Sequence, residues 1–137
     1  MLVCPVRACG LALSRESRRL VCANSHSFDI ARSGYVNLLQ PQDRRSKQPG
    51  DSAEAVAARR RIYDLGVAVD ALNALDQLAQ PQPSDTVLDA GCGEGHYLGS
   101  LRDRHAFTAT GIDISIPAID AAAKRYPTCQ WFVVNAD

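Results

Sequence analysis

The chain lacks the features that mark membrane, disordered and exported proteins. None of its apolar runs approaches the roughly 18 consecutive residues that a membrane span requires. Basic and acidic residues number 15 each and 46% of the chain is hydrophobic, a balance that disordered proteins do not have. Its first residues, MLVCPVRACG, contain no basic segment leading into an apolar core and a small-residue cleavage site. We therefore expect a cytoplasmic globular protein that does not contact a membrane.

Disulfide bonds are not expected either. The chain has five cysteines, an odd number, and no export signal. Disulfide frameworks belong to exported proteins whose cysteines occur in pairs. Metal binding or burial in the core therefore remains as the role of these thiols.

The net charge of zero conceals an uneven distribution. Residues 1–61 carry eleven basic and five acidic side chains, a net charge of +6, so the remainder of the chain carries −6. One interpretation is that the first part contacts a polyanion and the second part a small or cationic ligand. The other is that the charges form only a solvated surface. The basic residues of the first part are Arg7, Arg15, Arg18, Arg19, Arg32, Arg44, Arg45, Lys47, Arg59, Arg60 and Arg61.

The first of three expected regions covers residues 1–40. Cys, Gly, Ser, Asn and Asp interrupt every apolar run there, which predicts turns and short strands such as 20–21 and 35–39. A unit of this size buries too little apolar surface to be stable without a cross-link. We therefore expect a stabilising cross-link in this N-terminal module.

Residues 41–83 form the second expected region, a basic connector followed by helix. The helical pattern begins at Asp51 or Ser52, either of which could cap it, and ends near Ala79 before two prolines, with a break at Gly66. The whole chain has no internal repeat, and its 137 residues allow one ordinary domain or two small ones.

The third region, residues 84–137, repeats the order strand, turn, helix. Strands alternating with helices predict a parallel sheet with right-handed crossovers, so the fold class is α/β. The expected strands are 86–90, 108–112 and 131–134, and the expected helices are 96–104 and 117–126.

A metal site is the strongest candidate in the first region. Cys4 and Cys9 are followed, after a gap of twelve residues, by Cys22 and His26. Thiolates and imidazole are the ligands that zinc prefers, and four protein ligands complete its shell, so the zinc would be structural. Its binding energy would also stabilise a unit too small to fold alone. The alternative is a set of unrelated buried thiols with a surface histidine.

The run VLDAGCGEG, residues 87–95, joins an expected strand to an expected helix through alternate glycines. Such glycines allow a sharp turn and a close approach of the backbone to a ligand. A dinucleotide fingerprint would need its third glycine at position 96, which is His96, so a nicotinamide cofactor fits poorly. A purely structural turn remains the alternative.

The acids around this turn fit S-adenosylmethionine better. Asp89 precedes the glycines, Asp113 ends the second strand, where it would accept hydrogen bonds from the ribose hydroxyls, and Asp137 stands where such folds contact adenine. The cofactor is a sulfonium cation, which suits the acidic half of the chain. The expected cofactor-binding residues are Asp89, Gly91, Gly93, Gly95, Asp113 and Asp137.

The sequence identifies no catalytic residue. Glu94 and His96 lie beside the glycine turn, where placement on a helix surface is expected for both. Cys92 and Cys129 have no basic neighbour and are expected in the core or a loop.

Several segments resemble one family in the order in which they occur. The four metal ligands are followed by HSFDIARSGYVNLL, RRSKQPGDSAEAVAARR, VLDAGCGEGHYL, GIDIS and AIDAAAKRYP. This series resembles the RlmA family of ribosomal RNA methyltransferases, which methylate N1 of a guanine in a hairpin of the 23S RNA. One departure is the first cysteine pair, which has four intervening residues where the family commonly has two; zinc knuckles tolerate this spacing.

The resemblance implies a zinc-binding RNA-recognition module in residues 1–40 and a Rossmann-like class I methyltransferase fold that binds S-adenosylmethionine in residues 84–137. It implies structural Zn²⁺ on Cys4, Cys9, Cys22 and His26, and a 23S rRNA hairpin as partner; a homodimer is the assembly we expect. The family fold has seven strands, so this chain, with its three, is expected to be an incomplete form without activity of its own. The alternative function is a non-enzymatic zinc-ribbon RNA-binding protein with a vestigial methyltransferase half.

Overall fold

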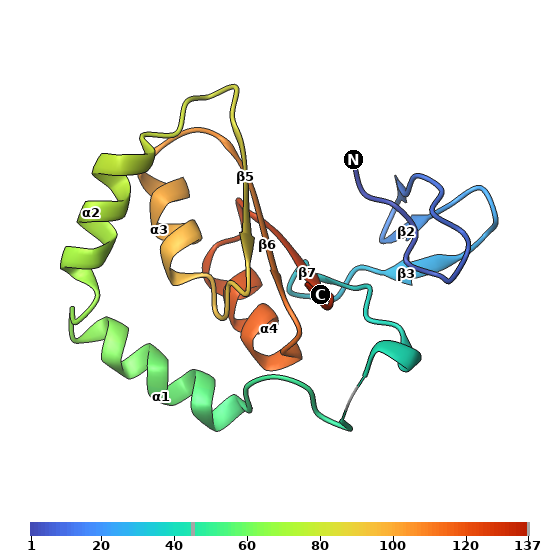
Figure 1. The fold of residues 1–137 in the computed structure, drawn as a ribbon, viewed down its shortest axis with the longest axis horizontal. Coiled ribbons are helices and arrows are strands. Elements are labelled where there is room, and N and C mark those ends of the chain that lie inside the picture. Colours follow the sequence, from blue (N-terminus) through green and yellow to red (C-terminus); the bar gives the residue numbers. More distant parts are fainter. Residues whose placement is uncertain (45, 137) are drawn as a thin grey trace.

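The computed structural model describes residues 1–44 and 46–136, which form two sheets and four α-helices (Figure 1). The small sheet is antiparallel, with strand order β1-β2-β3. Its strands are β1 (Ser14–Glu16), β2 (Arg19–Val21) and β3 (Ser27–Asp29). It contains the short strand expected at residues 20–21 and is bounded by tight turns.

The larger sheet is parallel throughout, with strand order β4-β7-β6-β5. The strands and helices follow the expected alternation from β5 onward. The strands are β4 (Val36–Asn37), β5 (Thr86–Ala90), β6 (Thr108–Asp113) and β7 (Gln130–Val133), and the helices are α1 (Ala53–Asp64), α2 (Val69–Ala79), α3 (His96–Arg104), α4 (Ile116–Arg125) and the 3-10 turn η1 (Pro41–Asp43). This confirms the α/β fold class.

The helix boundaries have local causes, and the sequence had indicated those at Ser52 and Gly66. Ser52 caps α1, because its side-chain oxygen accepts a hydrogen bond from the amide of Ala55 at 3.2 Å. The break between α1 and α2 falls at Gly66, whose φ of +79° favours glycine. Ser115 caps α4 in the same way through the amide of Ala118, with proline in the first turn.

The strand expected at residues 35–39 is present as β4, but its place in the larger sheet was not expected. The sequence predicted three strands there, whereas β4 from the N-terminal part of the chain pairs in parallel with β7, Val36 opposite Phe132. Burial explains the pairing: Val36 is 4% exposed and packs with Leu20, Leu38 and Phe132. The N-terminal module therefore shares a hydrophobic cluster with the larger sheet.

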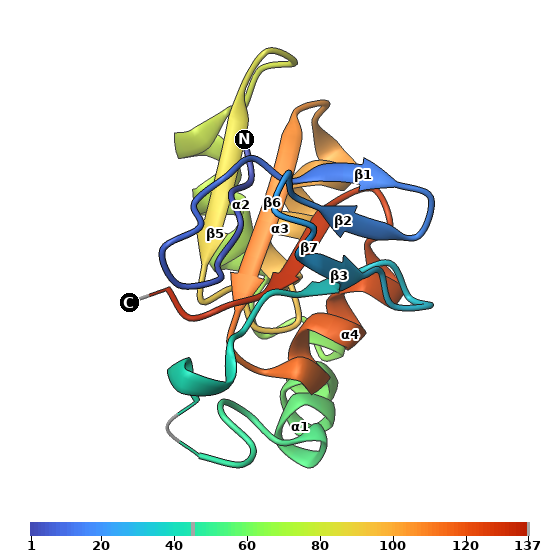
Figure 2. The same ribbon diagram turned by 90° about the vertical axis from the view of Figure 1, so that its right-hand side faces the viewer.

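The helices pack on one face of the larger sheet and the small sheet packs on the other (Figures 1 and 2). Side chains alternate along a strand, so Trp131 and Val133 face the helices and pack with Ile119, while Phe132 faces the small sheet and packs with Leu20. No helix among residues 1–44 and 46–136 is long and apolar enough to cross a membrane.

Two glycines allow the helix layer to pack closely. A Cβ atom on Gly99 of α3 would lie 2.2 Å from the ring of Tyr126, and one on Gly111 of β6 would lie 2.2 Å from Trp131. No side chain fits in either place without displacement of an aromatic ring. The α3–α4 packing thus depends on glycine at position 99.

Gly99→Ala tests this packing. Alanine at an unhindered helix position is more stable than glycine by about 1 kcal/mol, but the contact with Tyr126 should reverse the sign and destabilise the protein by about 1–3 kcal/mol. Urea unfolding measures the change, with Ser100→Ala on the next residue as control. A more stable Gly99→Ala variant would contradict the close packing.

Candidate metal centre and cofactor site

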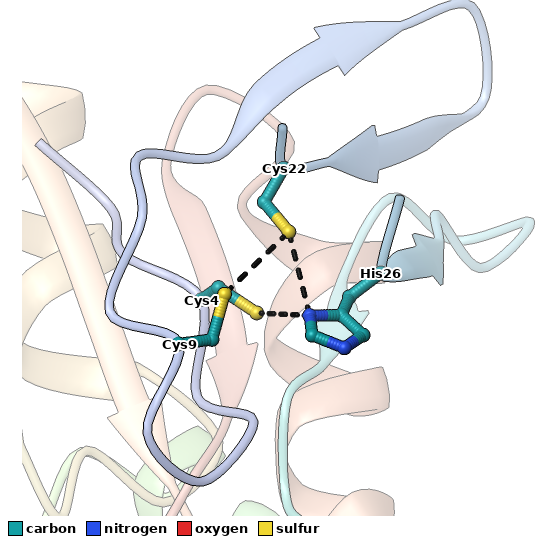
Figure 3. A group of neighbouring side chains, drawn as sticks. All are labelled: Cys4, Cys9, Cys22 and His26. Atoms are coloured by element: carbon teal, nitrogen blue, oxygen red, sulfur yellow. Dashed lines mark hydrogen bonds between the residues drawn. The ribbon is translucent and has the colours of Figure 1, made fainter. Parts of the chain in front are cut away.

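The four expected metal ligands converge on one point (Figure 3). Their ligand atoms all lie within 4.8 Å of one another. Nδ1 of His26 lies 3.4 Å from Sγ of Cys4 and 3.5 Å from Sγ of Cys22, and the Sγ atoms of Cys9 and Cys22 are 3.8 Å apart. The structure thus brings together all four residues that the sequence identified.

Two tight turns present the ligands. The first lies between Cys4 and Cys9 and is held by a hydrogen bond from the amide of Cys9 to the carbonyl of Val6 at 2.9 Å. The second connects β2 to β3, where the amide of Cys22 donates to the carbonyl of His26 at 3.1 Å. The longer first spacing is therefore accommodated within the turn.

These distances fit a tetrahedral zinc ion. With Zn–S near 2.3 Å and Zn–N near 2.0–2.1 Å, a tetrahedron separates two sulfurs by about 3.8 Å and a sulfur and a nitrogen by about 3.5 Å. The distances in the cluster agree with both values. Three thiolates and one imidazole nitrogen complete the shell, so the site fits a structural rather than a catalytic zinc.

The thiols of the cluster differ in how readily they ionise. A hydrogen bond from the backbone of Leu11 lowers the pKa of Cys9 to about 6, whereas burial raises the pKa of Cys4 to about 11. Zinc binds thiolates, so binding at neutral pH releases a proton from Cys4.

The glycine turn of the cofactor site connects β5 to α3 and is attached to the end of β6. The amides of Gly91 and Cys92 both donate to the carbonyl of Ile112, at 2.9 and 3.0 Å. Asp113 accepts two backbone hydrogen bonds, from Gly93 at 2.9 Å and from Ser115 at 2.8 Å. Its carboxylate therefore connects the glycine turn to the start of α4.

A cavity of about 230 Å³ opens beside this turn. Four of the expected cofactor residues line it, namely Asp89, Gly91, Gly93 and Asp113. Gly95 lies behind the wall, where a Cβ atom would be 2.3 Å from Trp131, and Asp137 lies outside the described residues. The α1 side chains Arg59 and Tyr63 also line the cavity, and no pattern in the sequence indicated either contribution.

Charge distinguishes this cavity, as the cofactor candidate, from a larger one. A hollow of about 580 Å³ lies between the small sheet and β7, but Arg15 is the only charged side chain among the described residues that line it. In the smaller cavity, burial and the nearby Asp113 raise the pKa of Asp89. Two carboxylates at the ends of adjacent parallel strands favour a cationic ligand.

Glu94 corrects an expectation from the sequence. It was expected on a helix surface, but only 1% of it is exposed. Its carboxylate accepts a hydrogen bond from Nε of Arg59 at 2.9 Å and lies 3.9 Å from Nε of Arg60. A carboxylate can be buried here because two arginines from α1 neutralise it.

His96 is half-buried and lies against α1. Its ring stacks on Tyr63, with centroids 4.0 Å apart and planes 6° apart. Burial lowers the pKa of His96, so the ring is neutral at pH 7. His105 pairs with Asp76 between α2 and α3, which leaves His26 as the histidine of the metal cluster.

The two remaining cysteines behave as expected. Cys129 is buried in the main core and Cys92 packs against it. Burial raises the pKa of both thiols, that of Cys129 to about 11, so neither is a nucleophile at neutral pH.

Most of the basic residues of the first half are on the surface. Arg59 and Arg60 are the exceptions, because they pair with Glu94. Arg45 lies outside the described residues. The exposed members are Arg7, Arg15, Arg18, Arg19, Arg32, Arg44, Lys47 and Arg61.

Each half of the chain matches a known protein family. Residues 2–47 match the N-terminal zinc-ribbon domain of RlmA, and residues 87–137 match a methyltransferase domain. Among solved structures, one match is a "TehB-like SAM-dependent methyltransferase" of Corynebacterium glutamicum, with a TM-score of 0.48 and 31% identity over 61% of this chain and 44% of that one. The family resemblance expected from the sequence is confirmed.

Two relatives match the chain almost from end to end. A putative 23S rRNA (guanine-N(1)-)-methyltransferase of Micromonospora griseorubida is 37% identical, over 92% of this chain and 48% of its own. The 23S rRNA (guanine(748)-N(1))-methyltransferase of Streptomyces fradiae is 36% identical, over 98% of this chain and 48% of its own. The chain spans about half the length of the curated relatives it matches.

We expect one zinc ion per chain, bound by the cluster in Figure 3. Cys22→Ser should abolish stoichiometric zinc and unfold the small sheet, because three ligands leave the tetrahedron incomplete. Cys92→Ser, at a cysteine outside the cluster, should retain zinc. Metal analysis of protein purified without chelator measures both, and stoichiometric zinc in Cys22→Ser would contradict the assignment.

Proposed function

Because residues 2–47 belong to the RlmA-type zinc-ribbon family and residues 87–137 to a methyltransferase domain family, we propose that the chain provides the RNA-binding and cofactor-binding parts of a 23S rRNA methyltransferase. The reaction is transfer of a methyl group from S-adenosylmethionine to N1 of a guanine in a hairpin. The main support is that one chain joins a cluster of zinc-type ligands to a glycine-turn cavity, and that relatives named for this reaction match it over almost its whole length.

The cavity residues suit the cofactor. Asp113 uses its carboxylate for two backbone amides, yet each carboxylate oxygen has a further lone pair for a ribose hydroxyl. Asp89 offers its carboxylate to the ammonium or sulfonium group. Gly91, with φ of +81° and nothing within 4 Å of its Cβ position, leaves room for a ligand against the backbone.

The role that we assign to the chain is positioning of the two reactants. When bound, S-adenosylmethionine supplies an electrophilic methyl group. The protein orients the acceptor nitrogen toward that methyl, and most of the rate comes from this orientation. The guanine has to leave its stack to reach the cavity.

The surface of the N-terminal module suits an RNA hairpin. Its exposed arginines alternate in sequence with the metal ligands, and further basic residues follow in the connector, which leads to α1 beside the cofactor cavity. Phosphate contacts by such residues fix the position of a nucleic acid without reading its sequence. The module would thus hold the hairpin next to the cavity.

A methyl-transfer assay tests whether this chain is sufficient for the reaction. A methyl group on N1 blocks the pairing edge of guanine and stops primer extension at that position. Strand β5, which leads into the glycine turn, is an edge strand of the described sheet, and Leu88 on it is 60% exposed, so the sheet is open to water on this side. We therefore expect the 137-residue chain to bind the cofactor but to produce no stop by itself. A stop produced by this chain alone would show that the open side is not needed.

Cofactor binding should depend on pH through Asp89. The ionised carboxylate attracts the ligand ammonium group, and the pKa of Asp89 is raised, so affinity should fall on acidification from a pH above the ordinary aspartate value of about 3.9. Calorimetry with S-adenosylhomocysteine measures this dependence. Asp89→Asn should weaken binding and flatten the pH profile, while the exposed Asp85→Asn should change neither. A profile unaltered in Asp89→Asn would remove Asp89 from the site.

RNA binding should depend strongly on salt. If about five of the exposed basic residues contact phosphates, log affinity should fall with log salt with a slope of roughly −3.5 to −4.5. Replacing Arg18 and Arg32 by Gln should make the slope shallower by about 1 for each phosphate that is no longer neutralised, whereas Lys124→Gln on α4 should leave it unchanged. Filter binding to the hairpin at several salt concentrations measures the slope. A slope near zero would mean that the charges are only a solvated surface.

A further inference from the structure

Arg59 lies across the glycine turn from α1. Two of its three guanidinium nitrogens are paired with carboxylates: Nη1 lies 2.7 Å from Oδ2 of Asp51, and Nε lies 2.9 Å from Oε2 of Glu94. These two contacts, at different nitrogens, fix the plane of the guanidinium group. The orientation of the third nitrogen is therefore determined.

The third nitrogen, Nη2, is buried and has no hydrogen-bond partner among the described residues. It faces the glycine turn, since a Cβ atom on Gly93 would lie 3.2 Å from it. A buried donor without an acceptor lowers the stability of the folded state, and such groups are uncommon in folded proteins. Because Arg59 is one of the residues that line the cofactor cavity, a ligand bound there can supply the missing acceptor.

The charge of the cavity limits what that acceptor can be. Four acidic residues line it, namely Asp51, Asp89, Glu94 and Asp113, and Arg59 is the only arginine or lysine among the described lining residues. An acidic cavity with one oriented cation suits a ligand that carries a positive group and a single anionic group. The amino-acid part of S-adenosylmethionine, with its ammonium and carboxylate, has this pattern.

We propose that Nη2 of Arg59 binds the carboxylate of the amino-acid part of the cofactor, and that Asp51 and Glu94 position Arg59 for this contact. The inference rests on the proposed function, because it takes S-adenosylmethionine as the ligand of the cavity. It explains why Glu94 is buried in the glycine turn, which sequence reasoning had placed on a helix surface. Asp89, across the cavity, remains available to the ammonium group.

The test compares S-adenosylmethionine with its decarboxylated analogue, which differs only in the missing carboxylate. The wild-type chain should bind S-adenosylmethionine about 10- to 100-fold more tightly, the usual range for a hydrogen bond to a charged group. Arg59→Gln should lose this preference through weaker binding of S-adenosylmethionine, with affinity for the analogue within about twofold. Arg61→Gln, an exposed arginine on the same helix, should keep the preference.

A second variant separates recognition from folding. Arg59→Gln leaves the buried carboxylate of Glu94 without its closest partner, which destabilises the loop. The double variant Arg59→Gln, Glu94→Gln removes both charges of that pair and should fold as judged by circular dichroism. It should also bind the two ligands equally. Because the preference is a ratio measured in one sample, a reduced folded fraction does not alter it.

The outcomes distinguish the inference from the proposed function. If the wild-type chain binds both ligands equally, or if the double variant keeps the preference, Arg59 does not bind the carboxylate, although the cofactor assignment stands. If the wild-type chain binds neither ligand, the cofactor assignment fails and the inference fails with it.

Discussion

The buried carboxylate of Glu94 is the constraint on which the cofactor cavity depends. Removing a carboxylate from water costs several kcal/mol unless cations and hydrogen bonds compensate for it. Arg59 and Arg60 provide that compensation, and both belong to α1. Helix α1 must therefore lie across the glycine turn, and this position gives the cavity its second wall, with Arg59 and Tyr63 opposite Asp89 and Asp113.

The N-terminal module is connected to this site through the sheet. Strand β4 follows the metal cluster and pairs with β7, so the module packs on the face of the sheet opposite the helices. The shared cluster around Val36 and Phe132 makes the metal centre and the cofactor sheet parts of one folded unit. A hairpin held by the module and a cofactor bound at the turn would then have a fixed relation to each other.

Much of the site could be predicted from the spacing of residues in the sequence, because the residues concerned lie on single turns or at the ends of adjacent strands. The cysteine–cysteine pair and the cysteine–histidine pair each lie on one turn, and the ends of β5 and β6 bring Asp89 and Asp113 to one edge of the sheet whatever the rest of the chain does. The boundaries of α1 and α2 were indicated for the same reason, by Ser52 and Gly66. Glu94 and Arg59 could not be paired in this way, because 35 residues separate them and neither has a periodic partner.

Residue type and short-range spacing were enough to predict the metal ligand set, the α/β alternation and the glycine turn, since each depends on geometry within a few residues. Three other features required the folded chain: β4 joins the larger sheet, Gly95 packs on Trp131 behind the cavity, and α1 supplies the only lining arginine among the described residues. These features arise from burial across long sequence separations. Which apolar or charged group meets which partner is settled by the packing of the whole chain, and no local pattern contains that information.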